Sequence, residues 1–315
     1  MGWEYCLVDV NWDTKIGYDS IALLANYARS KNVGLILWYN SAGSWNTTPY
    51  HPKDRILTTE SRRAEFSRLQ QLGIKGVKID FFGGDGQSMI AYYHAILKDA
   101  ADFQLLVNFH GATLPRGWQR TYPHLVTAEA VKGFEMVTFG QDAADQQAAH
   151  CSMLPYTRNV FDPMDFTPMN LYKIPTQVQR KTSSAFELAL SVVFWSGIQH
   201  YAESPEGMEK VPAYVQDFLH DLPDSWEDMR WLDGYPGEYI VLARKSGKKW
   251  YIAGINGSSA IKTIRLNPKH WIFRSGLLLR DGTAGSLFDQ TILSGQVPAS
   301  IPLPPGAGFV LVLED

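Results

Sequence analysis

The chain has 315 residues, with 29 Lys and Arg against 32 Asp and Glu, so its formal net charge is −3 at neutral pH. Hydrophobic residues make up 45% and charged residues 19%, a balance that excludes an intrinsically disordered or fibrous protein. The small net charge, without a run of Lys and Arg, argues against nucleic acid as a partner, and no apolar run reaches the roughly 18 residues of a membrane span.

Over the first two thirds of the chain, short apolar runs alternate with amphipathic stretches of helical period. Near-continuous apolar runs are typical of parallel strands that are buried on both faces. Strands that alternate with helices form βαβ units, so we predict an α/β fold, a (β/α)8 TIM barrel over residues 1–228. The runs predicted as strands are Tyr5–Trp12, Val33–Asn40, Gly76–Gly83, Phe103–Gly111, Leu125–Val131 and, more weakly, Thr157–Phe166 and Ala189–Ile198. These seven runs are one fewer than the eight strands of a complete barrel.

The pattern changes near Trp226–Asp233, where short alternating strands separated by Gly and Pro turns begin. This pattern predicts an all-β sandwich over residues 229–315. The segment Lys245–Lys249 reads as the turn of a hairpin. The strands expected here are Tyr239–Arg244, Trp250–Ile255, Ile261–Leu266, Trp271–Leu279, Leu287–Leu293 and Gly308–Leu313.

Polar residues stand at the carboxyl ends of the predicted barrel strands. In a (β/α)8 barrel the active site is built at these ends, where the βα loops converge. A single polar residue there often only caps the following helix, but carboxylates at the ends of several strands together favour a catalytic site. The strand-end residues are Asp9, Asn11, Asn40, Asp80, Asn108, His110, Glu129, Asp162 and Asp165.

The strand that ends at Asp80 gives the most specific signal. Side chains alternate along a strand, so Lys78 and Asp80 point to the same side. The Lys78 ammonium can keep Asp80 ionised and can also hold a substrate hydroxyl. An ionised carboxylate near aromatic residues is what the nucleophile of a glycosidase requires. The alternative is a buried ion pair with a purely structural role.

A second carboxylate is expected from the segment Glu129–Glu135. Retaining hydrolysis of a glycoside needs two carboxyl groups about 5–5.5 Å apart, one nucleophilic and one with a raised pKa. Glu129 closes a predicted strand, whereas Glu135 lies on the following loop. From the pattern alone, either residue could be the acid/base.

Four long motifs closely resemble glycoside hydrolase family 97: GVKIDFFGGDGQ, VNFHGATLPRGWQRTYPHL, TAEAVKGFE and FWSGIQHYAES. The resemblance runs from Tyr5 to about Ser204, and the predicted C-terminal sandwich also fits the family. Members have an N-terminal β-sandwich, a central barrel and a C-terminal β-sandwich, and they cleave α-glucosides or α-galactosides. By this resemblance, we expect the N-terminal sandwich and the first barrel strand to be missing from this sequence.

The resemblance implies a mechanism with retention of configuration. Retaining members carry an Asp nucleophile at the end of the fourth barrel strand, which matches Asp80. Inverting members instead place a Glu base after the His that ends the fifth strand, where this chain has Gly111 after His110. We therefore expect a retaining, exo-acting α-galactosidase that works by double displacement.

The resemblance also assigns roles to further residues. The later Glu of the Glu-x₅-Glu pair, Glu135, matches the acid/base, and Glu129 matches a ligand of the family's Ca²⁺ ion, with Glu135 in the same metal site. Hard oxygen donors suit Ca²⁺. The residues expected to bind the sugar, the first four by weaker similarity to related α-galactosidase barrels, are Asp9, Trp12, Trp38, Lys78 and His110.

Two alternatives remain at this point. One is an α-glucosidase with the same fold, and the other is a non-catalytic carbohydrate-binding or inactive barrel fragment. The expected partner is an oligosaccharide or another α-glycoside, and an incomplete barrel predicts self-association or a partner chain that covers its open edge. The sequence does not reveal a localisation, and the family resemblance implies export into the periplasm or out of a bacterial cell.

Overall fold

The computed structural model describes residues 2–283 and 285–315. Contacts within the chain divide these residues into two compact units: residues 2–131 with 162–165, and residues 132–161 with 166–315. Together they contain an α/β barrel-like portion with a parallel sheet and a C-terminal antiparallel β-sandwich, which confirms the predicted fold class. The domain boundary between residues 228 and 229 stays a prediction.

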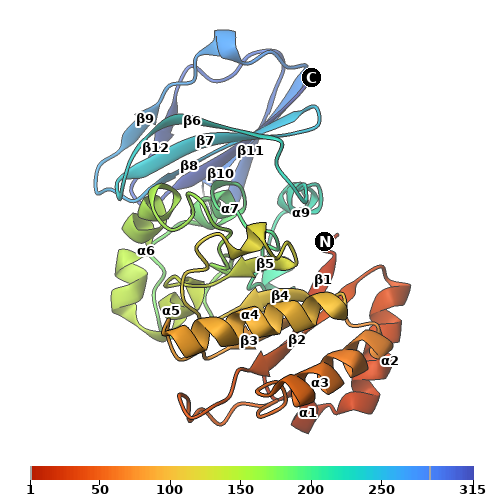
Figure 1. The fold of residues 1–315 in the computed structure, drawn as a ribbon. Coiled ribbons are helices and arrows are strands. Elements are labelled where there is room, and N and C mark those ends of the chain that lie inside the picture. Colours follow the sequence, from red (N-terminus) through yellow and green to blue (C-terminus); the bar gives the residue numbers. More distant parts are fainter. Residues whose placement is uncertain (1, 284) are drawn as a thin grey trace. The chain divides into compact units, whose positions relative to one another are not determined.

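The first unit is built around a five-stranded parallel sheet in the order β1-β2-β3-β4-β5. Its longer helices, α2, α3 and α4, cover one face of the sheet, as Figure 1 shows. The elements are β1 (Tyr5–Val8), α1 (Trp12–Lys15), α2 (Tyr18–Ser30), β2 (Gly34–Asn40), α3 (Thr59–Leu72), β3 (Gly76–Asp80), α4 (Gln87–Asp102), β4 (Leu106–Phe109), the 3₁₀ turn η1 (Trp118–Arg120) and β5 (Leu125–Ala128). The first five predicted strands are thereby confirmed.

Every second residue of each strand is buried in the core between this sheet and its helices. Leu37 and Tyr39 of β2, Ile79 of β3 and Phe109 of β4 are fully buried among the apolar side chains of the three helices. Because side chains alternate along a strand, the residues between them point to the opposite face of the sheet. Helix α3 begins at a capping box, in which the Thr58 side chain accepts a hydrogen bond from the Ser61 N–H.

The second unit opens with helices and continues as antiparallel sheets. Its helical elements are α5 (Phe134–Phe139), α6 (Gln141–Met153), η2 (Leu154–Tyr156), α7 (Ser184–Val193), α8 (Pro205–Met208) and α9 (Ala213–His220). Its strands and last 3₁₀ turn are β6 (Asp228–Tyr235), β7 (Tyr239–Ser246), β8 (Lys249–Asn256), β9 (Lys262–Ile264), η3 (Pro268–His270), β10 (Ser275–Asp281), β11 (Phe288–Leu293), β12 (Ile301–Leu303) and β13 (Gly308–Glu314). Among the described residues, no helix is both long enough and apolar enough to cross a membrane.

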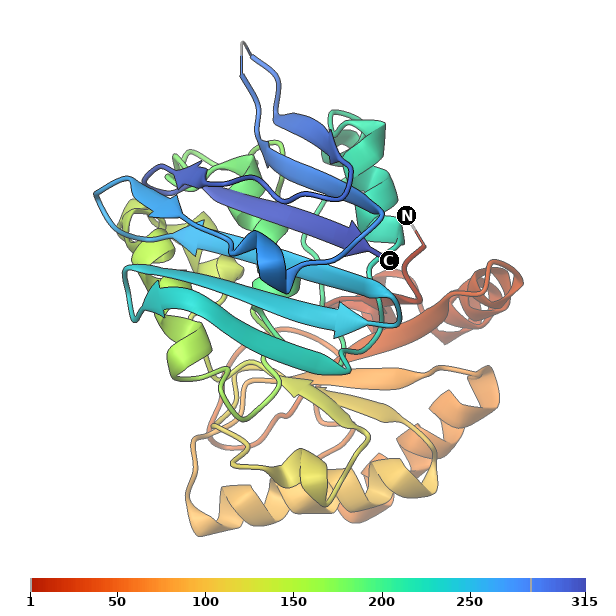
Figure 2. The same cartoon turned by 90° about the horizontal axis from the view of Figure 1, so that it is seen from above.

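The sandwich consists of a six-stranded sheet, in the order β11-β10-β13-β8-β7-β6, and the pair β12-β9. Figure 2 shows the strands of the larger sheet, coloured cyan to blue, side by side. The predicted hairpin at Lys245–Lys249 is confirmed, because β7 and β8 are joined by a two-residue turn with Gly247 at φ +54°. Inside the sandwich, Val241, Ile252 and Phe309 belong to one buried apolar cluster.

Two predicted strands are wrong. Residues 157–166 have no regular secondary structure, and most of the run Ala189–Ile198 belongs to helix α7 and the turn that follows it. Every residue of α7 is buried, and the helix packs against β8 and β13 of the six-stranded sheet. A helix that is buried on all sides has no polar stripe, so its apolar run cannot be distinguished from a buried strand by periodicity.

Helix α7 carries a buried acid, Glu187, whose side chain accepts hydrogen bonds from Gln147 and Thr182. Burial raises the pKa of Glu187 from 4.5 to about 7, although the Arg180 charge and the two hydrogen bonds lower it. Because the folded chain binds this proton more tightly than the unfolded chain, the contribution of the protonated carboxyl is complete below pH 4.5 and is lost as the pH rises to about 7. That shift corresponds to about 3 kcal/mol of unfolding free energy.

The Glu187→Gln variant is therefore expected to lose most of this pH dependence and to be more stable than the wild type at pH 8. Chemical denaturation at pH 4.5 and at pH 8 measures the effect. The exposed Glu209 provides a matched control, because Glu209→Gln removes a charge that is already solvated. A Glu187→Gln variant that is less stable than the wild type at pH 8 would contradict the expectation.

Candidate active site

The face of the parallel sheet that points away from the helices carries polar side chains in two transverse rows. Residues Trp38, Lys78, Asn108 and Thr127 lie in register on the neighbouring strands β2, β3, β4 and β5. Asp9 follows β1, whose last residue Val8 pairs with Leu37, so Asp9 extends this row beyond Trp38. Because the strands are parallel and in register, four residues predicted from the sequence lie in one row: Asp9, Trp38, Lys78 and Asn108.

The second row lies one step closer to the carboxyl ends of the strands. Asn40 pairs with Asp80, and His110 and Glu129 directly follow β4 and β5. The four side chains are all buried. Their strands deliver them to one edge of the sheet, which is where the βα loops of a barrel form active sites.

Asp80 is held by groups on three sides. Its Oδ1 accepts a hydrogen bond of 2.7 Å from the Phe81 N–H, and its Oδ2 lies 3.3 Å from the indole N–H of Trp38. Nδ1 of His110 is also 3.3 Å from Oδ2. Burial raises the pKa of Asp80, but the hydrogen bond and charge of His110, the charge of Lys78 and the Phe81 N–H outweigh burial, so the pKa lies below its usual value. Asp80 is therefore ionised at neutral pH.

His110 lies between two acids. Its Nδ1 is 3.3 Å from Asp80 Oδ2 and 3.5 Å from Glu129 Oε2. Burial lowers the pKa of His110 and so does the Lys78 charge, but the hydrogen bond to Asp80 and the charges of Asp165 and Asp80 give a net increase. The neighbouring carboxylates therefore favour the protonated form of the ring.

Glu129 has the opposite electrostatic environment to Asp80. Burial raises its pKa, and the charges of Asp80 and Asp165 raise it further, whereas His110 and the Gly111 N–H lower it. That N–H donates to Glu129 Oε2 at 2.7 Å. Two neighbouring carboxyl groups with pKa shifts in opposite directions are typical of acid and base pairs in catalysis.

Asp165 was predicted only as one of the polar residues at strand ends, without a specific role. It lies far along the chain from β4, yet its Oδ2 accepts a hydrogen bond of 2.6 Å from Asn108, and both side chains are buried. Its carboxylate acts on His110 and on Glu129. The polar residues at predicted strand ends were a signal for Asp165, although residues 157–166 form no strand.

Trp12 lies away from the polar rows. Its indole ring is only 1% exposed, belongs to the core that faces the helices and packs edge-on against Tyr18 and Tyr39. Its N–H donates to the backbone carbonyl of Trp38 at 2.8 Å. The structure thus shows Trp12 supporting the strand that carries Trp38, and a direct contact with a sugar stays a prediction.

Glu135 belongs to the second unit of the chain. It lies in the first turn of α5, where its side chain is exposed, and the helix begins after Gly133. The N–H of Phe134 donates to the carbonyl of Phe166 at 2.9 Å, which ties the start of α5 to the segment that follows Asp165. The predicted pairing of Glu135 with Asp80 across a scissile bond stays a prediction.

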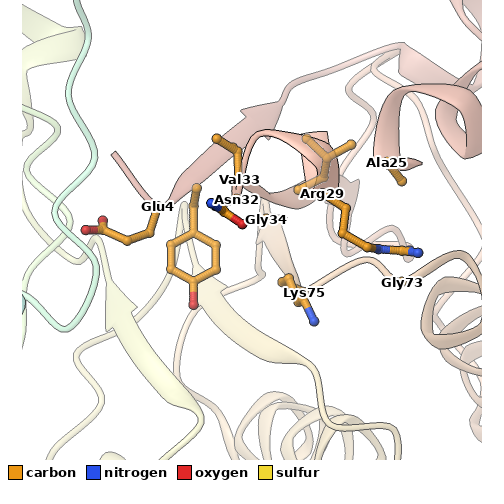
Figure 3. A pocket seen from close by; sticks show the side chains of 10 residues that line it. Glu4, Ala25, Arg29, Asn32, Val33, Gly34, Gly73 and Lys75 are labelled. Atoms are coloured by element: carbon orange, nitrogen blue, oxygen red, sulfur yellow. The ribbon is translucent and has the colours of Figure 1, made fainter. Parts of the chain in front are cut away.

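A cavity of about 320 Å³ lies at the opposite ends of the strands (Figure 3). Glu4, Tyr5, Gly34 and Lys75 line it, at or just before the first residues of β1, β2 and β3. Asp80 is the last residue of β3, so this cavity contains none of the site residues described above. In barrels, residues at this end of the strands serve stability rather than chemistry, and we assign the cavity no catalytic role.

Two family models match parts of this chain. The family model described as "Glycoside hydrolase 97" matches residues 1–131, and "Glycosyl-hydrolase 97 C-terminal, oligomerisation" matches residues 225–269. The chain belongs to glycoside hydrolase family 97. The resemblance predicted from the four motifs is thereby confirmed.

Curated family 97 relatives match almost the entire chain. A probable retaining α-galactosidase of Streptomyces bingchenggensis is 36% identical over 99% of this chain and 47% of its own length. A retaining α-galactosidase of Bacteroides thetaiotaomicron is 29% identical over 99% of this chain and 48% of its own length. The chain therefore spans about half the length of these curated relatives.

A solved structure in this comparison has a different named activity. The crystal structure of a β-arabinopyranosidase superposes with a TM-score of 0.92 and 37% sequence identity, over 98% of this chain and 50% of the other. The family 97 fold of the chain is thus the same as that of an experimentally determined enzyme structure.

Proposed function

We propose that this family 97 chain is the catalytic part of a retaining, exo-acting α-galactosidase. The observation that carries the proposal is the state of Asp80: a buried carboxylate at the carboxyl end of a barrel strand, held ionised by His110, Lys78 and a backbone N–H. A nucleophile of this kind must be ionised and stripped of solvent before it attacks. The two curated relatives named as retaining α-galactosidases support the choice of substrate.

The proposed reaction is a double displacement. An oxygen of Asp80 attacks the anomeric carbon while the bond to the leaving oxygen breaks and Glu135 donates its proton to that oxygen. Glu135, now a carboxylate, takes a proton from water, which attacks the anomeric carbon and releases Asp80 with overall retention. Glu129, with its raised pKa, is the alternative acid/base.

The row beneath Asp80 supplies groups that can bind the sugar. Lys78 can donate to hydroxyl groups, and the exposed Asp9 can accept from them. The Trp38 ring is 1% exposed and its N–H points at Asp80, so it would form the floor of the proposed sugar site rather than an open stacking surface. His110 lies 3.3 Å from Asp80 Oδ2, so it can contact a sugar that reacts with this carboxylate. We propose these four residues as the substrate-binding set, with Trp12 acting through Trp38.

The resemblance to the family implies a Ca²⁺ ion, with Glu129 and Glu135 as the residues that would hold it. The environment of Glu129 fits a cation, because its buried carboxyl feels the charges of Asp80 and Asp165, which a bound cation would offset. Carboxylate oxygens are the donors that Ca²⁺ prefers. When bound, Ca²⁺ would polarise substrate oxygens and hold hydroxyl groups in place.

A second candidate activity follows from the named activity of the solved structure. A β-L-arabinopyranoside has the ring configuration of an α-D-galactoside and lacks only the hydroxymethyl group at C5. The contacts of the pocket at C5 therefore decide which of the two sugars it prefers. The similarity to the β-arabinopyranosidase makes this activity the second candidate. It ranks ahead of α-glucosidase activity, because an α-glucoside has the opposite configuration at its 4-hydroxyl.

Rates on three nitrophenyl glycosides test the proposal. We expect kcat/KM on the α-galactoside to exceed that on the α-glucoside by about 10²-fold or more, because a site that binds an axial hydroxyl leaves polar groups unpaired with the epimer. The β-L-arabinopyranoside is expected in between. A preference for arabinopyranoside selects the runner-up, and sugar binding without hydrolysis of any of the three would indicate a non-catalytic carbohydrate-binding chain.

Self-association is proposed for the C-terminal part. The family model that matches residues 225–269 is described as "Glycosyl-hydrolase 97 C-terminal, oligomerisation", and this range covers β6, β7, β8 and β9. On β6, which forms one edge of its sheet, Met229, Trp231 and Tyr235 are exposed. Light scattering on the purified chain measures the expected dimer or higher oligomer.

A further inference from the structure

The residue after the proposed nucleophile has an unusual backbone. Phe81 has φ +68°, in the left-handed region that bulky residues avoid. Such a conformation is strained and persists only where the surrounding structure enforces it. Contacts with neighbouring residues must therefore hold Phe81 in this conformation.

Three side chains from the segment after β2 hold it. The Phe81 carbonyl accepts hydrogen bonds from Ser41 Oγ at 2.9 Å, Trp45 Nε1 at 3.0 Å and Asn46 Nδ2 at 3.2 Å. The Ser41 N–H also donates to the carbonyl of Asp80 at 2.8 Å. A carbonyl oxygen with three donors is fixed in direction, and this fixes the peptide planes around it.

The consequence reaches the carboxylate of Asp80. With its carbonyl held by the three donors and its φ positive, Phe81 directs its own N–H at Asp80 Oδ1, 2.7 Å away. On the other side, Gly111 leaves room for that oxygen, since a β-carbon there would lie 2.6 Å from Oδ1. Oδ1 is thus confined, while Oδ2 lies against the Trp38 and His110 nitrogens.

We propose that Ser41, Trp45 and Asn46 are positioning residues for the nucleophile and that they act through the Phe81 carbonyl. The inference deepens the proposed function, because it takes Asp80 as the attacking group. Each of the three side chains donates to the Phe81 carbonyl; together they fix the peptide group that follows Phe81 and thereby the backbone conformation of Phe81, whose N–H orients the Asp80 carboxylate. A carboxylate that must approach an anomeric carbon in line loses rate steeply when it is displaced.

The first test removes one donor and keeps a ring. Trp45→Phe is expected to lower kcat on an aryl α-galactoside by about 10- to 10²-fold while KM stays within about twofold. Trp118→Phe makes the same truncation elsewhere in the same unit and is expected to leave both constants unchanged. Thermal unfolding of both variants separates a loss of position from a loss of fold. A wild-type kcat for Trp45→Phe overturns the proposal.

A coupling test separates a positioning role from a general structural one. Asn adopts the left-handed conformation more readily than Phe, so Phe81→Asn needs less support from the three donors. The loss of kcat caused by Trp45→Phe is expected to be smaller in the Phe81→Asn background than in the wild type. Equal losses in the two backgrounds would show that Trp45 acts by another route.

A readout without turnover keeps the inference independent of the proposed function. In chain labelled with ¹⁵N-phenylalanine, the Phe81 amide, identified by its absence in Phe81→Asn, is expected downfield and slow to exchange, because it donates to a carboxylate. In Trp45→Phe it should move upfield and exchange about tenfold faster. An unchanged Phe81 signal overturns the inference. If the wild-type chain cleaves no glycoside but the signal changes, the proposed function fails and the positioning of Asp80 stands.

Discussion

Asp80→Asn is expected to lower kcat on an aryl α-galactoside by about 10⁴-fold or more. The amide keeps the size of the side chain and can still occupy the space between Phe81, Trp38 and His110, but it cannot form the glycosyl ester. The charge that His110 and Lys78 stabilise is also lost. Steady-state assays at saturating substrate measure the effect, and the stability of the fold is checked by thermal unfolding.

Azide provides the decisive control for Asp80. A small anion that enters the site of the variant can attack the anomeric carbon, so partial recovery with a β-glycosyl azide as product is expected. Asp85→Asn is a matched control from the loop after the same strand, since Asp85 is exposed and pairs only with Arg116 among the described residues. Near-wild-type turnover by Asp80→Asn would remove Asp80 from the mechanism.

Glu135→Gln is expected to give the second largest effect, and the effect should depend on the leaving group. An acid that protonates the leaving oxygen contributes about 10²- to 10⁴-fold when that oxygen is strongly basic. Substrates with alkyl or sugar leaving groups should therefore lose rate by this amount, whereas dinitrophenyl glycosides, which depart without a proton, should lose far less in the first step. The slope of log kcat/KM against the leaving-group pKa measures the difference.

Glu129→Gln distinguishes the two candidates for the acid. As a metal ligand, Glu129 should affect good and poor leaving groups equally, and its loss should weaken Ca²⁺ binding measured by calorimetry. As the acid, it should show the leaving-group dependence expected of Glu135. A steep leaving-group dependence for Glu129→Gln together with a flat one for Glu135→Gln would exchange their roles.

The sequence predicted the first five strands because each is a short apolar run that closes on a polar residue. It also predicted that Lys78 and Asp80 share a face, because that follows from strand alternation alone. Their neighbours Trp38 and Asn108 could not be placed beside them in advance, since the register between strands depends on the packing of whole helices against the sheet. The C-terminal hairpin was predictable from its turn residues.

Other features depend on tertiary context that a sequence pattern does not encode. Helix α7 is buried on every side, so its residues carry no helical stripe. Trp12 follows the strand-end residues Asp9 and Asn11, yet its side chain is buried in the core, where its indole N–H donates to the carbonyl of Trp38. The left-handed backbone of Phe81 is not predictable from the sequence, because a bulky residue adopts this conformation only where neighbouring residues enforce it.

The bare α-carbon of Gly111 constrains how such enzymes can evolve. A methyl group there would meet Asp80 Oδ1 at 2.6 Å and the Phe81 nitrogen at 2.9 Å, and the backbone has φ +50°. An acid at position 111, after β4, and the acid Asp80, at the end of β3, therefore cannot both occupy these positions with the present backbone. A change from one arrangement to the other therefore requires more than one substitution.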